Sequence, residues 1–162
     1  MNLRLIQAFK QSPSYCGPAC LKMVLHYYGK EVTEEELGVV AKTTFEDGTT
    51  NDNLLLAAQA YGLDGVWHQN GTIEELRTYA HTNVPVIIEW FSSDESPAPG
   101  EPHYSIVLDV TDIHVLLLDP EDGKQYEMSH VKFMSTWFSF SGPYIKQNSD
   151  VRLRHYLPLI AK

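Results

Sequence analysis

The sequence predicts an α+β fold in which N-terminal helices pack on an antiparallel sheet. The first half of the 162-residue chain carries helix signals, namely amphipathic spacing and N-cap residues, whereas the second half carries short apolar runs separated by turn residues. Because helical and strand-rich segments follow one another and do not alternate, we expect the helices to gather on one side of the sheet. A single domain, residues 1–162, is the organisation expected at this length.

The first predicted helix begins near Cys16 and ends at Gly29. Pro18 falls in its first turn, where a missing N–H removes no hydrogen bond. Apolar side chains then recur at helical spacing and define one buried stripe, which consists of Leu21, Val24, Leu25 and Tyr28. Residues 3–9, ahead of this helix, are predicted to form a short strand or an extended lead-in.

Three further helices are predicted in the first half of the chain. The pattern Thr-Glu-Glu-Glu at residues 33–36 is a capping box and opens a helix that runs to about Lys42. A helix near 53–61 follows a turn-rich loop and stops at a glycine. A second capping box opens the helix predicted over 72–81.

The remaining segments are predicted as strands, with one late helix among them. The helix covers about residues 130–138. The loop at 92–102 is rich in serine, proline and acidic residues, and we expect it to be mobile and to border the cleft. The predicted strands cover 65–69, 84–91, 103–110, 113–118, 124–128 and about 151–160.

Charge and hydropathy exclude two broad classes of function. The net charge of −9 leaves no basic cluster to neutralise phosphates, so no nucleic-acid partner is expected. The longest apolar runs have the length of strands, far below the roughly 20 residues that a membrane span needs, and no signal-peptide pattern is present. We therefore expect a soluble, cytoplasmic protein. The sequence carries no signal for an oligomeric state.

The two cysteines have different expected roles. Cys16 and Cys20 lie four residues apart on one helix, about 6 Å between Cβ atoms, which is too far for a disulfide. Cys16 stands at the helix start, where free N–H groups and the dipole favour a thiolate nucleophile, although a small buried thiol fits the same position. Gln11, a few residues earlier, has a side-chain amide that can donate to an oxyanion. Cys20 is expected to be a core residue.

A histidine and an aspartate further along the chain are candidates to act with Cys16. His103 opens an apolar strand and Asp119 closes the next, so a tight antiparallel hairpin is expected between them. An odd loop centred on Thr111 would set His103 opposite Asp119. This register also gives a consistent apolar face, made of Ile106, Leu108, Leu116 and Leu118. A satisfied strand histidine and a strand-ending turn aspartate are the plainer interpretations.

Other polar residues indicate no further site. Glu89 lies in an apolar strand; a solvent-facing edge position is expected, and a buried functional carboxylate is the alternative. No spacing of His, Cys or Asp matches a zinc site, and the acidic loop at 47–52 lacks the calcium-loop pattern. The sequence therefore predicts no metal and no cofactor.

Several sequence blocks follow one another along the chain. They are Gln11, the run Tyr-Cys-Gly-Pro-Ala-Cys at 15–20, Asp-Gly-Thr-Thr at 47–50, Val-Pro-Val-Ile at 84–87, His-Tyr-Ser-Ile-Val-Leu at 103–108 and Leu-Asp-Pro at 118–120. Together these blocks resemble the C39 family of papain-like cysteine peptidases over about residues 7–125. The resemblance implies a papain-like α+β fold with a peptide or protein substrate. It implies Cys16 as nucleophile, His103 as general base and Asp119 as its orienting carboxylate, with Gln11 in the oxyanion hole.

Two other functions remain open on the same residues. Family members fused to ABC transporters remove leader peptides after a Gly-Gly pair, whereas this chain resembles the stand-alone C39-like proteins. An acyl-transferring enzyme similar to phytochelatin synthases would use the same cysteine with an amine in place of water. A non-catalytic C39-like domain would bind a peptide without turnover.

Overall fold

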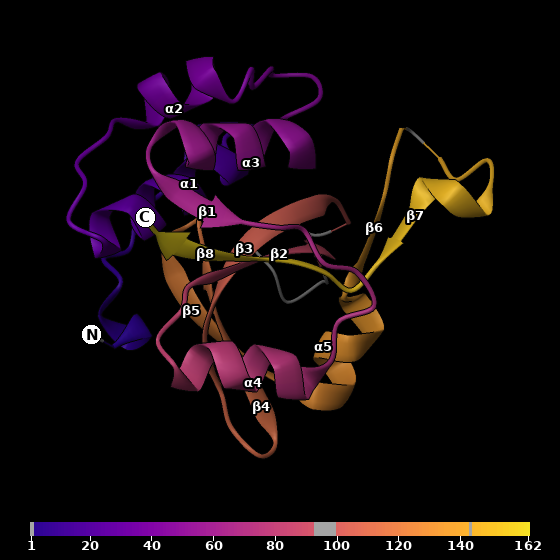
Figure 1. Cartoon of the computed structure of the whole chain (residues 1–162). Helices are drawn as coiled ribbons and strands as arrows, with labels where there is room; N and C mark the ends of the chain where they lie inside the picture. Colours follow the sequence, from indigo (N-terminus) through magenta and orange to yellow (C-terminus); the bar gives the residue numbers. More distant parts are fainter. Residues whose placement is uncertain (1, 93–99, 143) are drawn as a thin grey trace.

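The computed structural model describes residues 2–92, 100–142 and 144–162, and it is built from an antiparallel sheet with helices on both of its faces (Figure 1). The helices are α1 (Cys16–Tyr27), α2 (Glu34–Val40), α3 (Asn51–Ala60), α4 (Ile73–His81) and α5 (His130–Thr136), with short 3₁₀ turns at Leu3–Leu5 and Asn148–Asp150. The strands are β1 (Leu63–Gly65), β2 (Val86–Phe91), β3 (Pro102–Val110), β4 (His114–Asp119), β5 (Lys124–Ser129), β6 (Phe138–Phe140), β7 (Val151–Leu153) and β8 (His155–Ala161).

Six strands form the main sheet, in the order β1-β8-β2-β3-β4-β5, and every neighbouring pair is antiparallel. Strands β6 and β7 pair separately, and this β6–β7 ribbon projects from the body of the molecule (Figure 1). The predicted α+β class is confirmed. The predicted loop at 92–102 falls largely on residues 93–99, which lie outside the described residues.

The predicted helices form where their capping signals stand. Both capping boxes are present: Thr33 caps α2 together with Glu36, and Thr72 caps α4 together with Glu75. Helix α3 begins two residues earlier than predicted because the hydroxyl of Thr50 accepts the N–H of Asn53 and thereby acts as its N-cap.

The sequence suggested that the helices gather on one side of the sheet, and this prediction was wrong. Helices α1, α2 and α3 form a helical layer on one face, and α4 lies across the other (Figure 1). The strand register agrees with this arrangement. Tyr104 and Tyr156 pair with two neighbouring residues of β2, and because side chains alternate along a strand, the two tyrosines point to opposite faces of the sheet. Tyr104 contacts Asn51 of α3, whereas Tyr156 packs near Tyr79 of α4.

Four strand predictions were wrong in detail. The strand predicted at 65–69 is β1, which ends at Gly65. Residues 3–9 begin with a 3₁₀ turn, where a strand or extended lead-in was predicted. The predicted closing strand is divided into β7 and β8 at Arg154, whose φ of 50° takes it out of extended geometry. Strand β6 was not predicted, because its three residues carry too short a pattern to distinguish from a helix end.

The β3–β4 hairpin differs from its predicted register. Its loop has an even count, with Val110 opposite Val115, and a β-bulge at Leu108 shifts the pairing by one residue, so that Ile106 lies opposite Leu118. Beyond the bulge, the same side chains of β3 and β4 share a face as they would have done with an odd loop. His103 and Asp119 therefore share a face but are displaced by two residues, and are not directly opposed.

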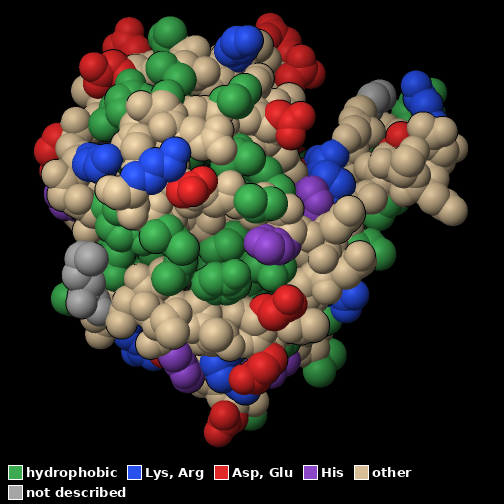
Figure 2. Space-filling model, in the orientation of Figure 1, with side chains coloured by type: hydrophobic (Ala, Val, Ile, Leu, Met, Phe, Trp, Pro, Cys, Tyr) green, Lys and Arg blue, Asp and Glu red, His purple; other side chains and the backbone are tan. Residues whose placement is uncertain are grey.

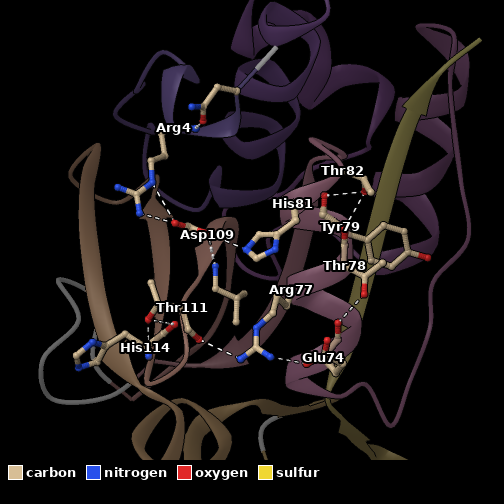
Figure 3. A network of polar contacts seen from close by, with 12 residues as sticks. Arg4, Glu74, Arg77, Thr78, Tyr79, His81, Thr82, Asp109, Thr111 and His114 are labelled. Carbon is tan, nitrogen blue, oxygen red and sulfur yellow. Dashed lines mark hydrogen bonds and ion pairs between the residues drawn. The ribbon is translucent and has the colours of Figure 1, made fainter.

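A polar network fastens this hairpin to two other segments (Figure 3). Asp109 of β3 is paired with Arg4 from the first 3₁₀ turn and lies 3.7 Å from His81 of α4. Arg77 of α4 donates to the carbonyl of Thr111 at 3.1 Å. The network therefore connects the β3–β4 hairpin to the first 3₁₀ turn and to α4.

Candidate active site

Cys16 is the first residue of α1 and is partly buried. Its N-cap neighbour, Tyr15, makes no side-chain capping bond to the described residues, so the first-turn N–H groups stay available to an anion beside the sulfur. A tight turn precedes the helix, with the N–H of Tyr15 donating to the carbonyl of Ser12 at 3.0 Å. The predicted placement of a thiol at a helix N-terminus is confirmed.

His103 and Asp119 form a buried pair. Nε2 of His103 lies 2.8 Å from Oδ1 of Asp119, and the two residues are 5% and 1% exposed. Because Asp119 engages Nε2, the other ring nitrogen, Nδ1, is the one left for a reacting group. Burial by itself lowers the pKa of His103, but hydrogen bonds with Asp119 and Cys16, together with their charges, raise the pKa to about 10. The imidazole is therefore protonated at neutral pH.

Asp119 is itself held by two further hydrogen bonds. Its Oδ1 accepts the backbone N–H of Glu121 at 2.9 Å, and its Oδ2 accepts the hydroxyl of Ser105 at 3.3 Å. The Ser105 oxygen in turn accepts the indole N–H of Trp90 at 3.0 Å. The carboxylate is thus fixed from both sides in a site where water does not reach it.

Gln11 reaches the same region through the turn that follows Asp119. Its backbone N–H donates to the carbonyl of Pro120 at 2.8 Å, and its side-chain Oε1 is buried with no partner among the described residues. The next residue, Ser12, is bound through both its N–H and its hydroxyl to the carboxylate of Glu34, at 2.8 and 2.6 Å. The start of the segment that carries Gln11 to Cys16 is therefore anchored to two different parts of the fold.

The structure thus brings all four predicted site residues toward one end of the sheet. His103 and Asp119 are in direct contact, Cys16 belongs to the environment that raises the pKa of His103, and Gln11 is attached next to Asp119. Cys20, one helical turn after Cys16, is fully buried, and its burial raises the pKa of its thiol well above the usual value. Its expected role as a core residue agrees with this position.

Glu89 does not occupy the solvent-facing edge position that the sequence favoured. It is 4% exposed in the central strand β2, and Arg152 of the β6–β7 ribbon holds both of its oxygens, at 2.8 and 2.6 Å. Ser139 and Asn51 each donate to it at 2.8 Å. Figure 2 shows a notch between the ribbon and the helical layer, with basic and histidine side chains at its base.

Sequence reasoning missed three residues around the site: Glu34, Ser105 and Trp90. In the sequence, the position of Glu34 is typical of an ordinary first-turn carboxylate of a capped helix. The positions of Ser105 and Trp90 are typical of apolar strands. Trp90 is related to the site by its pairing with His103 and Ser105 by its bond to Asp119, and neither contact between strands is visible in a single sequence.

In the described part of the chain, the predicted site is not a metal centre, and it is not part of a cavity that lies along β1 and β8. Among the described residues, no cluster of three or more His, Cys, Asp or Glu side chains has the arrangement of a metal site. The cavity has a volume of about 480 Å³, and its lining residues, such as Val66, Tyr79 and Pro158, include none of the four predicted site residues. In the same described part of the chain, no helix is long and apolar enough to cross a membrane.

Comparisons with known proteins agree on one family. The model of the peptidase C39 family matches residues 6–141. The pediocin PA-1 transport/processing ATP-binding protein PedD of Pediococcus acidilactici is 31% identical over 161 residues, which cover 91% of this chain but 20% of that protein. An uncharacterized protein of Methanothermobacter thermautotrophicus is 33% identical over 115 residues, 70% of this chain and 71% of its own length.

Solved structures show the same fold. The peptidase domain of Streptococcus ComA, a bi-functional ABC transporter, superposes with a TM-score of 0.71 at 22% identity and covers 97% of this chain and 99% of that one. A double glycine motif protease from an AMS/PCAT transporter, in complex with the leader peptide, gives a TM-score of 0.65 at 21% identity and covers 93% and 88%. The papain-like α+β arrangement predicted from the sequence is thereby confirmed.

Proposed function

This chain belongs to the peptidase C39 family, and on that premise we propose that it is a cysteine peptidase whose nucleophile is Cys16. The observation that carries the proposal is the buried His103–Asp119 pair, whose free ring nitrogen is left for a thiol at the start of α1. A buried imidazolium beside a sulfur favours the thiolate, which is the nucleophilic form of cysteine.

The proposed reaction proceeds through an acyl-enzyme. The Cys16 thiolate attacks the carbonyl carbon of the scissile peptide bond, and the carbonyl π electrons move to oxygen to give a tetrahedral oxyanion. As that intermediate collapses, the C–N bond breaks and His103 gives its proton to the departing amine. The neutral His103 then takes a proton from water, which attacks the thioester and releases the acid and the Cys16 thiolate.

The oxyanion needs hydrogen-bond donors where its charge develops. The backbone N–H groups at the start of α1 provide one set, and the side-chain amide of Gln11 provides another. Asp119 keeps the imidazole in the productive orientation throughout.

Peptides with a double-glycine leader are the first substrates to test. A neighbouring structure contains such a protease with its leader peptide, and PedD is described as a processing protein. We propose a peptide or protein substrate of this class for the chain. Incubation with a double-glycine leader peptide should yield two fragments in the wild-type protein and none in Cys16→Ala.

The sharpest test of the nucleophile is the pH dependence of its alkylation. Iodoacetamide should label Cys16 readily already at pH 6, because an imidazolium beside the sulfur favours the thiolate and His103 keeps its proton up to about pH 10. In His103→Ala, labelling should fall at pH 6 and rise only near the ordinary thiol range of about 8.5. Peptide mapping by mass spectrometry reads Cys16 and Cys20 in one sample, and buried Cys20 is the internal control.

Three outcomes separate the candidate functions. Equal, slow labelling of both cysteines would refute the enzyme and leave a peptide-binding domain. Fragments that carry an added amine in place of a free acid would identify an acyl transferase. Free-acid fragments, together with labelling that depends on His103, are the results that the peptidase proposal requires.

A further inference from the structure

Resting on the proposed function, we propose that Ser105 and Trp90 are positioning residues that orient the Asp119 carboxylate, and that they act as a directed hydrogen-bond relay from β2 through β3 to β4. The relay consists of two bonds: the indole N–H of Trp90 to the Ser105 oxygen at 3.0 Å, and the Ser105 hydroxyl to Oδ2 of Asp119 at 3.3 Å.

The direction of the relay follows from what each group can donate. The indole nitrogen of Trp90 is a donor only, so the Ser105 oxygen must accept from it. Ser105 has one hydroxyl proton, and the acceptor that the described residues offer to it is Oδ2 of Asp119. The proton on Ser105 is therefore committed to Asp119, and Trp90 fixes the rotation of that hydroxyl.

The strand register places the relay next to the catalytic pair. Extending the pairing of Ile106 with Leu118 by one position puts Ser105 directly opposite Asp119. Trp90 is paired with His103, and the centres of their rings lie 6.4 Å apart. One relay residue thus faces the carboxylate, while the other lies beside the imidazole.

Burial gives the relay its importance. Ser105 is completely buried, and Asp119 is 1% exposed, so water cannot replace a lost hydrogen bond to Oδ2. Without the serine hydroxyl, Oδ2 would be left unpaired and the carboxylate would be held only through Oδ1. The plane of the carboxylate, and with it the angle at which it meets Nε2 of His103, would then be less well defined.

The test uses Trp90→Phe, which removes the bond from Trp90 to Ser105, and Ser105→Ala, which removes both bonds of the relay. Both should lower kcat about tenfold or more with little change in KM, because the substrate does not touch the relay. The rate of Cys16 alkylation at pH 6 should fall in both variants. The double variant should be little worse than either single one, since one missing bond already breaks the relay.

Ser139→Ala and Trp137→Phe are matched controls. Both residues are equally buried, and their hydrogen bonds lie away from Asp119. Ser139 donates to Glu89 and accepts from Arg152, and Trp137 donates to the carbonyl of His155. These controls should lose thermal stability to a similar extent but keep the wild-type pH profile of Cys16 alkylation.

If Ser105→Ala and Trp90→Phe also keep the wild-type profile and kcat, the relay is refuted. If wild-type labelling is itself independent of His103, the proposed function fails first.

Discussion

Glu89 illustrates at the scale of a single residue how a buried charge is made stable. Burial raises the pKa of this carboxyl, but hydrogen bonds from His155, Arg152 and Asn51 and the charge of Arg152 outweigh it and lower the pKa to about 2. Arg152 holds it with two parallel N–H groups, the strongest common geometry for such a pair. Glu89 thereby attaches the β6–β7 ribbon to the centre of the main sheet.

The pH dependence of stability should report this carboxylate. Because its pKa is lowered on folding, from 4.5 to about 2, its contribution is present above pH 4.5 and is lost as the pH falls through 2. The loss should be about 3 kcal/mol in the free energy of unfolding. Urea unfolding between pH 5 and pH 2 measures it.

The matching variants are Glu89→Gln and Glu74→Gln. Glu89→Gln should be less stable at pH 6, because Arg152 loses its buried counter-ion, but should show a flatter dependence on pH in the acid range. Glu74 is an exposed carboxylate paired with Arg77, and its replacement should leave the slope unchanged. A Glu89→Gln variant with the full wild-type slope would contradict the assignment.

Residues of the site differ in how far the sequence can predict them. Cys16, Gln11, His103 and Asp119 could be proposed as site residues because helix starts, strand ends and family blocks are local patterns. The environment of Glu89 was not, because Arg152 lies 63 residues away in the sequence and no local pattern brings it near. Contacts between distant polar residues depend on the tertiary structure alone.

At the scale of elements, the packing of α2 against the segment before α1 positions Cys16, the proposed nucleophile. Gly38 lies inside α2, and a Cβ there would overlap the ring of Tyr15, the residue immediately before Cys16. Glu34, one turn earlier on α2, holds Ser12. Helix α2 therefore contacts the segment from Gln11 to Cys16 near both of its ends, at Ser12 and at Tyr15.

Gly38→Ala separates this packing effect from helix propensity. In an open helix interior, Ala is more favourable than Gly by up to about 1 kcal/mol. Here the added methyl group should instead displace Tyr15, so we expect lower thermal stability and slower Cys16 alkylation at pH 6. Thermal unfolding and labelling measure the two effects.

Val39→Ala is the control for Gly38→Ala. Val39 is the next residue of α2 and is largely exposed, so its truncation should leave Cys16 labelling unchanged. A stabilised Gly38→Ala protein with normal labelling would show that α2 does not constrain the start of α1.

Elements with local end signals were predicted well, and strand pairing was not. The capping boxes at Thr33 and Thr72 determine where α2 and α4 begin because their bonds close within four residues. The hairpin loop was predicted with the wrong parity because the bulge at Leu108 depends on pairing across two strands. His103 and Asp119 share a face only because the even loop and the bulge compensate for each other.

At the scale of the whole molecule, the end of the chain lies in the interior of the sheet. Strand β8 pairs with β1 on one side and with β2 on the other. The family match, in contrast, ends at residue 141, before β7 and β8. We propose that residues 1–162 form one cooperative domain, since β8 and Arg152 complete a sheet and a charge pair begun much earlier in the chain.

A chain truncated after Ser141 should therefore fail to fold. It would expose the edges of β1 and β2 and leave Glu89 buried without Arg152, a loss of about 3–5 kcal/mol for the charge pair alone. This is a large part of the stability of an ordinary domain. Circular dichroism and Cys20 alkylation should both report an unfolded chain, whereas removal of Lys162 alone should change little. A truncated chain that still protects Cys20, and still labels Cys16 in a His103-dependent manner, would show that the catalytic half folds independently.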